Sequence, residues 1–194
     1  MRTCLEQARI DCPMPPPPEI PARYQGASIT MIEDTNLQAL ATEYLRKFEV
    51  LGSEGIGPVL LGRSRTYKTV AAAALAKGIW KAFSVGVVFV GCIDQLPQME
   101  LLRYDPGTAK RIKQWCATPV LVLDDFMIAR PGTWAADILL AVLSARFNAL
   151  RPTIITGNII LEKGREWAAL AEIHNPALAH RLEEGGRGFT LFVE

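Results

Sequence analysis

Long apolar runs are missing from this chain of 194 residues. No apolar stretch approaches the roughly 20 residues that a membrane-spanning helix needs. The opening residues, MRTCLEQARIDCP, also lack the apolar segment of a secretory signal. The sequence therefore predicts a cytoplasmic protein without a membrane span.

An excess of one charge is missing as well, because 21 Lys and Arg residues face 20 Asp and Glu residues, for a net charge of +1. Any contact with DNA must therefore come from a local basic patch. Cys4, Cys12, Cys92 and Cys116 are widely spaced and form no C-x-x-C pair, which argues against a zinc site. Apolar residues, in contrast, make up 49% of the chain, which is typical of one globular domain with a real core.

Proline is concentrated near the start of the chain, in the segment PMPPPPEIP at residues 13–21. Proline has no backbone N–H, so this segment is predicted to be an extended polyproline linker. We expect residues 1–27 to form a tail and residues 28–194 to form the core. Preformed polyproline segments bind well to other proteins, so the tail is also a candidate partner-binding peptide.

Short apolar runs alternate with helical patterns from residue 35 onward. Such alternation predicts a five-stranded parallel sheet that is covered by helices on both faces. Ligands bind such sheets at the carboxyl ends of the strands. The predicted strands are residues 58–61, 85–90, 119–123, 152–156 and 189–193, and the predicted helices are 36–50, 68–83, 93–115 with a break near Asp105, 133–149, 162–172 and 175–184.

Residues 58–69, PVLLGRSRTYKT, have the layout of a phosphate-binding loop: a strand, a loop and then a helix that opens with Lys-Thr. Lys68 would reach the β- and γ-phosphates of a nucleotide, and the Thr69 hydroxyl would bind Mg²⁺. The pattern wants glycine before the lysine, and Tyr67 stands there, so an ordinary loop with a chance Lys-Thr remains the alternative. The predicted nucleotide-binding residues are Gly62, Arg63, Ser64, Arg65, Thr66, Tyr67, Lys68, Thr69 and Val70.

Polar side chains follow two further strands. Asp124 and Asp125 end the strand VLVLDD, where two acids are costly unless a cation or water uses them. Asp124 would hold the Mg²⁺ through water, and Asp125 would orient and polarise the attacking water. Asn158 ends the next strand and could lie between that water and the γ-phosphate, although an Asn that caps a helix is the common alternative.

Arg181, in ALAHRLEEGGRGF, lies far along the chain from the loop. Such an arginine could act as an arginine finger in the site of a neighbouring subunit. A solvated arginine on an exposed helix face is the alternative.

The order GRSRTYKT, LVLDDF, RPTIITGN and HRLEEGGR resembles the AAA+ ATPases of the DnaC/IstB type, which include replicative helicase loaders and a transposition helper. The resemblance begins near Pro21 and runs to the end of the chain. It implies an AAA+ three-layer P-loop fold without a separate lid domain, and ATP/ADP with Mg²⁺ as ligands. It further implies Lys68 and Thr69 as Walker A residues, Asp124 and Asp125 as Walker B, Asn158 as sensor 1, and Arg181 as an arginine finger that acts in trans within an oligomer.

The sequence departs from that family in two places. Arg65 and Tyr67 replace the inner glycines of the phosphate loop, where the backbone takes unusual dihedral angles. Only some 20 proline-rich residues precede the core, whereas loaders usually carry a helicase-binding domain there. This small size favours a protein encoded by a phage or a mobile element.

Two basic groups are candidates for DNA contact. The first, with aromatics interleaved as in single-strand binding, comprises Arg103, Tyr104, Lys110, Arg111, Lys113 and Trp115. The second, placed near the nucleotide loop, comprises Arg63, Arg65, Lys77 and Lys81. A solvated helix face is the alternative for both.

The leading functional hypothesis is an ATPase that loads or remodels a replicative hexameric helicase on single-stranded DNA. One alternative is an IstB-like transposition helper, which would act with a transposase and prefer duplex DNA. The other is a degenerate P-loop adaptor that does not turn over ATP.

Overall fold

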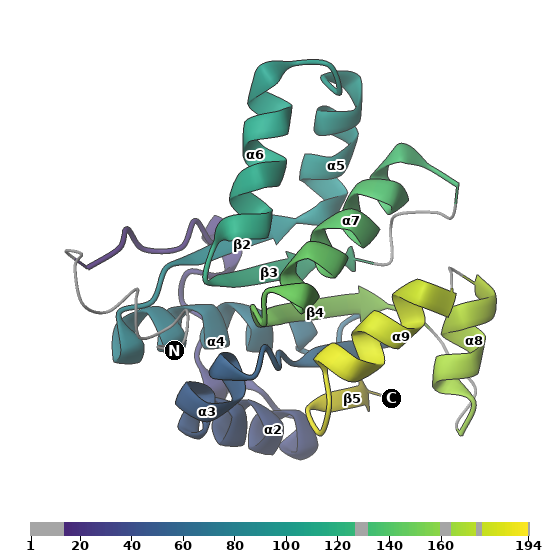
Figure 1. Ribbon diagram of the computed structural model, residues 1–194. Helices are drawn as coiled ribbons and strands as arrows, with labels where there is room; N and C mark the ends of the chain where they lie inside the picture. Colours follow the sequence, from purple (N-terminus) through teal and green to yellow (C-terminus); the bar gives the residue numbers. More distant parts are fainter. Residues whose placement is uncertain (1–13, 127–131, 160–163, 174–175, 194) are drawn as a thin grey trace.

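A single sheet of five parallel strands, in the order β2-β3-β4-β1-β5, forms the centre of the protein (Figure 1). The structure is a computed structural model that describes residues 14–126, 132–159, 164–173 and 176–193. It confirms the predicted parallel sheet. The strands are β1 Val59–Gly62, β2 Val87–Gly91, β3 Val120–Asp124, β4 Thr153–Asn158 and β5 Thr190–Val193.

The helices follow the predicted pattern with three differences. The helix expected over residues 162–172 begins at Glu166, and two short 3-10 helices precede the first predicted helix. The single helix expected over residues 36–50 is two helices, because Lys47 leaves the helical dihedral angles between them (φ −98°, ψ 7°). The helices are η1 Ala22–Tyr24, η2 Ile29–Met31, α2 Thr35–Arg46, α3 Phe48–Ser53, α4 Lys68–Phe83, α5 Cys92–Leu101, α6 Pro106–Ala117, α7 Trp134–Asn148, α8 Glu166–Ile173 and α9 Pro176–Gly185. Residues 162, 163 and 175 of the last two predicted helices lie outside the described residues.

The predicted break near Asp105 is confirmed, since α5 ends before it and α6 begins directly after it. The Asp105 carboxylate accepts a hydrogen bond of 2.7 Å from the backbone N–H of Gly107 and so caps α6. Pro106 occupies the first turn, where a missing N–H costs nothing. The two helices form a hairpin that projects from the sheet (Figure 1).

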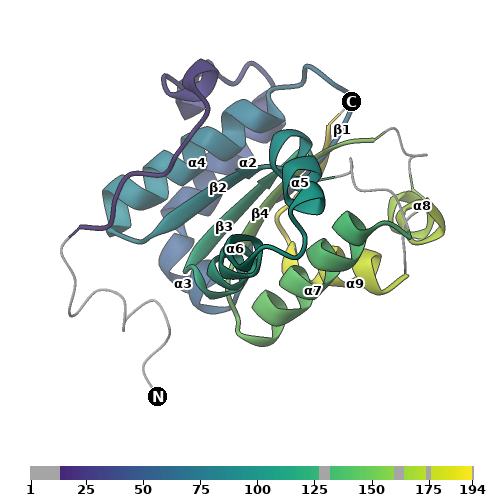
Figure 2. The same ribbon diagram turned by 90° about the horizontal axis from the view of Figure 1, so that it is seen from above.

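The helices cover both faces of the sheet, which gives the predicted three layers (Figure 2). Successive residues of a strand point to opposite faces, so Leu60 packs with α2, α3 and α4 while Leu61 packs with α5 to α9. Ile154 and Ile155 divide between the two faces in the same way. In the part of the chain that the structure describes, no helix is long and apolar enough to cross a membrane.

The proline-rich segment, from Met14 onward, runs along α4. The Trp80 indole N–H donates 2.7 Å to the carbonyl of Pro15, and Ile20 is buried in the core. The Lys77 ammonium donates to the carbonyls of Gln25 and, at 2.9 Å, of Ala27. The sequence placed Lys77 in a basic group that could contact DNA. In the structure its ammonium instead binds the backbone of the segment that precedes the first long helix.

Candidate functional site

The strand order explains how distant residues meet. Strand β4 lies between β1 and β3, with Gly62 of β1 paired to Asn158 of β4. The loop after β1, the acids at the end of β3 and Asn158 therefore lie at one edge of the sheet. Side-chain contacts between them, described below, confirm the predicted convergence.

The loop predicted to bind phosphate takes glycine-like dihedral angles without the inner glycines. Arg65 and Tyr67 both have left-handed backbones, with φ of 67° and 59°. This conformation costs an L-residue about 1–2 kcal/mol and persists only where the surroundings fix it. Tyr67 is fixed by packing against the core on the α4 side of the sheet. Replacing the two glycines by Arg65 and Tyr67 therefore does not change the left-handed backbone at these positions.

Gly62, in contrast, cannot be replaced. Its φ is +146°, and a Cβ atom built on it would lie 1.9 Å from the carbonyl oxygen of Val193 in β5. The close approach of β5 thus requires glycine where the loop begins.

Lys68 lies inside the loop and is only 4% exposed. Its ammonium donates 2.9 Å to the Thr66 hydroxyl and 3.3 Å to the carbonyl of Gly62, and also bonds the carbonyl of Arg63. Burial lowers the pKa of Lys68, while the negative charges of Asp125 and Asp124 act against that shift. The cation is therefore held at the centre of the loop and faces the two acids.

Asp124 connects the loop to the sheet. One carboxylate oxygen, Oδ1, accepts hydrogen bonds from the hydroxyls of Thr69 (2.9 Å) and Thr156 (2.6 Å). Burial raises the pKa of Asp124, and the bonds from these two hydroxyls oppose the rise. The contact with Thr69 brings together the two residues predicted to bind a metal.

Asp125 and Asn158 also meet. The Asn158 side-chain amide donates 2.6 Å to Oδ1 of Asp125, whose backbone is left-handed with φ of 55°. Burial raises the pKa of Asp125, and the charge of Lys68 acts in the opposite direction. A carboxylate with a raised pKa that is oriented by an amide can accept a proton from water.

Mg²⁺ and a nucleotide fit this site. Within the described residues, no cluster of three His, Cys, Asp or Glu side chains could hold a metal ion alone. Mg²⁺ usually binds to one or two carboxylates together with the phosphates of a substrate, and Asp124 with the Thr69 hydroxyl provides such a donor set. Over the described residues, no protein acceptor contacts the backbone N–H groups of residues 64–70, which suits a phosphate cradle at the start of α4.

Comparisons with known proteins support this arrangement at the level of the fold. No family model and no curated protein matches the sequence. The crystal structure of the DnaC helicase loader matches with a TM-score of 0.79 and 24% identity, over 90% of this chain and 100% of that one. This chain has the AAA+ fold. DnaI matches with a TM-score of 0.70 and 22% identity, over 91% of this chain and 94% of that one.

The AAA+ fold also appears in the replication initiator DnaA, solved with AMPPCP and single-stranded DNA. Its TM-score is 0.70 and its identity 15%, over 91% of this chain and 51% of the DnaA chain. This chain thus spans about half of DnaA. At these identities the likeness establishes the fold, and the resemblance to DnaC-type proteins that the motifs indicated is confirmed at that level.

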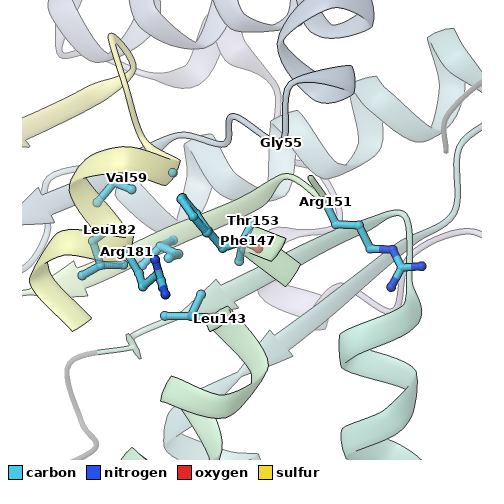
Figure 3. Close-up of a pocket in the computed structure, with 10 residues that line it drawn as sticks. Gly55, Val59, Leu143, Phe147, Arg151, Thr153, Arg181 and Leu182 are labelled. Atoms are coloured by element: carbon cyan, nitrogen blue, oxygen red, sulfur yellow. The ribbon is translucent and has the colours of Figure 1, made fainter. Parts of the chain in front are cut away.

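Arg181 is the one predicted site residue that lies elsewhere. Figure 3 shows it beside a pocket of about 20 Å³ that Gly55, Val59 and Thr153 also line, at the amino end of the sheet. Its guanidinium lies 4.6 Å from the centre of the Phe147 ring. The length of β1, about 10 Å at about 3.3 Å per residue, separates this end of the AAA+ fold from its own nucleotide loop. Arg181 is therefore not part of the arrangement around Lys68 in the same chain.

The first basic group lies on the α5–α6 hairpin. Tyr104 is 87% exposed at its tip, and the Arg103 guanidinium lies 4.9 Å from its ring centre. Lys110, Arg111 and Lys113 are exposed along α6. The inclusion of Trp115 was wrong, because that side chain is 1% exposed and packs in the core.

Thr156 is a site residue that the sequence reasoning missed. It lies among apolar residues in PTIITGN, so the segment was interpreted only as a buried strand. The sequence did contain a signal for this role, because Thr156 is a hydroxyl residue in an apolar strand and stands two residues before Asn158.

Proposed function

We propose that this chain binds Mg-ATP at the edge of the sheet, hydrolyses it and uses the cycle to load or remodel a replicative hexameric helicase on single-stranded DNA in the cytoplasm, as part of phage replication. The observation that carries the proposal is the contact between Thr69 and Asp124, which joins a phosphate-loop hydroxyl to a buried carboxylate. The likeness to a structure described as the DnaC helicase loader supports the choice of partner.

The geometry of the site supports the following roles. Lys68 and the loop N–H groups bind the phosphates, and Thr69 and Asp124 hold the metal. Bound Mg²⁺ neutralises charge on the phosphates and orients them. Asp125 accepts the proton of the attacking water, and Asn158 keeps the Asp125 carboxylate in place through its 2.6 Å hydrogen bond.

Lys68→Ala is expected to weaken ATP binding about 10- to 150-fold, because a charged hydrogen-bond donor to phosphate contributes about 1.5–3 kcal/mol. The measurement is a titration with fluorescent ATP in Mg²⁺. Lys81→Ala is the matched control, since Lys81 is exposed on the same helix. A wild type without saturable binding would show that the loop does not bind nucleotide.

Phosphate release by the wild type distinguishes an ATPase from a binding adaptor. Tyr67 and Arg65 motivate the adaptor, but both keep the left-handed conformation that glycine would supply. The ATPase proposal requires phosphate release that depends on Mg²⁺ and changes when single-stranded DNA is added. Saturable ATP binding with no phosphate release would favour the adaptor.

Helicase loading itself is tested by pull-down of the cognate hexameric helicase with and without ATP. We expect retention of the helicase and, in a separate binding assay, of single-stranded DNA through Arg103, Lys110, Arg111 and Lys113. Replacing these four by alanine should weaken DNA binding and reduce its salt dependence, because fewer phosphate contacts release fewer counterions. Empty pull-downs under both conditions would rule out the loader, and capture of a transposase instead would favour the transposition helper.

A further inference from the structure

The Thr156 hydroxyl lies between the two acids of the site. Thr156 is 1% exposed, within β4. Its hydroxyl donates 2.6 Å to Oδ1 of Asp124 and accepts 3.0 Å from the backbone N–H of Asp125. A hydroxyl has one hydrogen to donate and lone pairs to accept, so both bonds form at once.

The first bond fixes how the Asp124 carboxylate is rotated. Thr156 and Thr69 both donate to the same oxygen, Oδ1. In the described part of the chain, Oδ2 accepts no hydrogen bond, so it is the oxygen available to a metal or its water. Thr69 approaches from the nucleotide loop and Thr156 from the sheet, and loss of the Thr156 bond would leave only the loop side to hold this orientation.

The second bond holds the backbone of Asp125. This residue has a left-handed φ of 55°, which needs support from its surroundings. Strand β4 provides that support twice, because Thr156 accepts the Asp125 N–H and Asn158 donates to its carboxylate. The orientation of Asp125 therefore depends on the same hydroxyl as the orientation of Asp124.

We propose that Thr156 is a positioning residue that couples the metal-binding carboxylate of Asp124 to the backbone of the water-orienting Asp125. This inference rests on the proposed function. Hydrogen-bond partners behind metal-binding residues typically change metal affinity or activity by about 10- to 100-fold when they are removed. Valine has nearly the shape of threonine but no hydroxyl, so a role in packing alone predicts little change.

Thr156→Val is expected to lower the Mg²⁺-dependent gain in affinity for fluorescent ATP by about 10- to 100-fold, while affinity measured in EDTA stays unchanged. Thr156→Ser keeps the hydroxyl and should restore the gain. Thr190→Val is the matched control, since Thr190 lies in β5 and, among the described residues, its hydroxyl donates to the carbonyl of Gly186 and not to an acid of the site. If Thr156→Val does not fold, the effect of losing the hydroxyl is measured instead by comparing Thr156→Ala with Thr156→Ser.

Hydrogen exchange of the Asp125 amide, followed by NMR without nucleotide, is the second readout. The valine variant leaves this N–H without its acceptor, so the amide should exchange faster, and the serine variant should exchange as the wild type does. A wild type that fails to bind ATP would contradict the proposed function. The exchange experiment would still test the positioning role, because it is done without nucleotide. Wild-type exchange and wild-type Mg²⁺ dependence in Thr156→Val, or equal damage in the serine and valine variants, would overturn the positioning role.

Discussion

Replacing Arg146 by methionine is expected to lower the free energy of unfolding by about 3–5 kcal/mol, a large share of the total of about 5–15 kcal/mol typical of a domain. Arg146 is fully buried, at 0% exposure. Its guanidinium donates to the carbonyls of Trp115 (2.8 Å), Thr118 (2.7 Å) and Pro152 (2.7 Å). Each buried acceptor left without a donor costs about 1–3 kcal/mol, and methionine fills a similar volume but donates to none.

These bonds join the end of α6 to the chain that enters β3 and β4, together with further bonds to the carbonyl of Pro119 and the Thr153 hydroxyl. Urea unfolding followed by tryptophan fluorescence measures the loss. Arg146→Lys, which keeps some donors, should fall between the wild type and Arg146→Met. Arg46→Ala is the control, because Arg46 is exposed and, among the described residues, its ion pair is with Glu43 on the surface, where solvent screens the attraction and little stability is lost. A methionine variant as stable as this control would contradict the role of Arg146.

Arg181→Ala is expected to lower the rate of ATP hydrolysis by about 10³-fold or more, while ATP binding stays close to that of the wild type. Arginine fingers contribute about 10³- to 10⁵-fold to turnover in related phosphoryl-transfer enzymes. Arg181 lines a pocket with Val59 at the start of β1, whereas Lys68 opens α4 beyond the end of β1, so we expect the effect to act between subunits. Arg187→Ala is the control, because Arg187 is a nearby exposed arginine.

A mixture of Arg181→Ala and Lys68→Ala proteins decides between action in cis and in trans. Each variant lacks one half of the site, but a neighbour pair can combine the intact loop of one with the intact Arg181 of the other. Recovery of hydrolysis in the mixture is the expected result. A mixture as inactive as its components would contradict action in trans, and Arg181→Ala with wild-type turnover would leave Arg181 as a surface residue stacked on Phe147.

Much of the fold followed from local pattern. Runs such as VLVLDD and PTIITGN have the length and apolar character of buried parallel strands, and the helices between them have clear starts and stops. The convergence of Lys68, Asp124 and Asn158 then followed from topology, since the carboxyl ends of parallel strands share one edge. The strands and helices could be predicted because each depends mainly on residues that are close together in the sequence.

The errors and omissions concern side chains whose environment depends on distant segments. Trp115 was grouped with Lys113 on a basic surface, but the phase of α6 turns Trp115 into the core and leaves Lys113 exposed. Arg146 gave no signal, because an arginine in a helix is usually solvated, and only the approach of α6 and the chain before β3 makes it a buried donor. The sequence pattern also could not show that Tyr67 keeps the left-handed backbone that glycine usually takes at this position. Tertiary packing against the core, and not the residue type, holds this conformation.

The pairing of β5 with β1 has a practical consequence for experiments. The backbone N–H of Arg63 donates 3.3 Å to the carbonyl of Val193, so the last strand ends beside the first residue of the nucleotide loop (Figure 2). A bulky label attached to β5 would lie next to this loop and, if the proposed function holds, would crowd a bound nucleotide. Labels that should not disturb the loop therefore belong on the exposed face of α2, whereas a small dye on β5 would test whether the loop binds nucleotide.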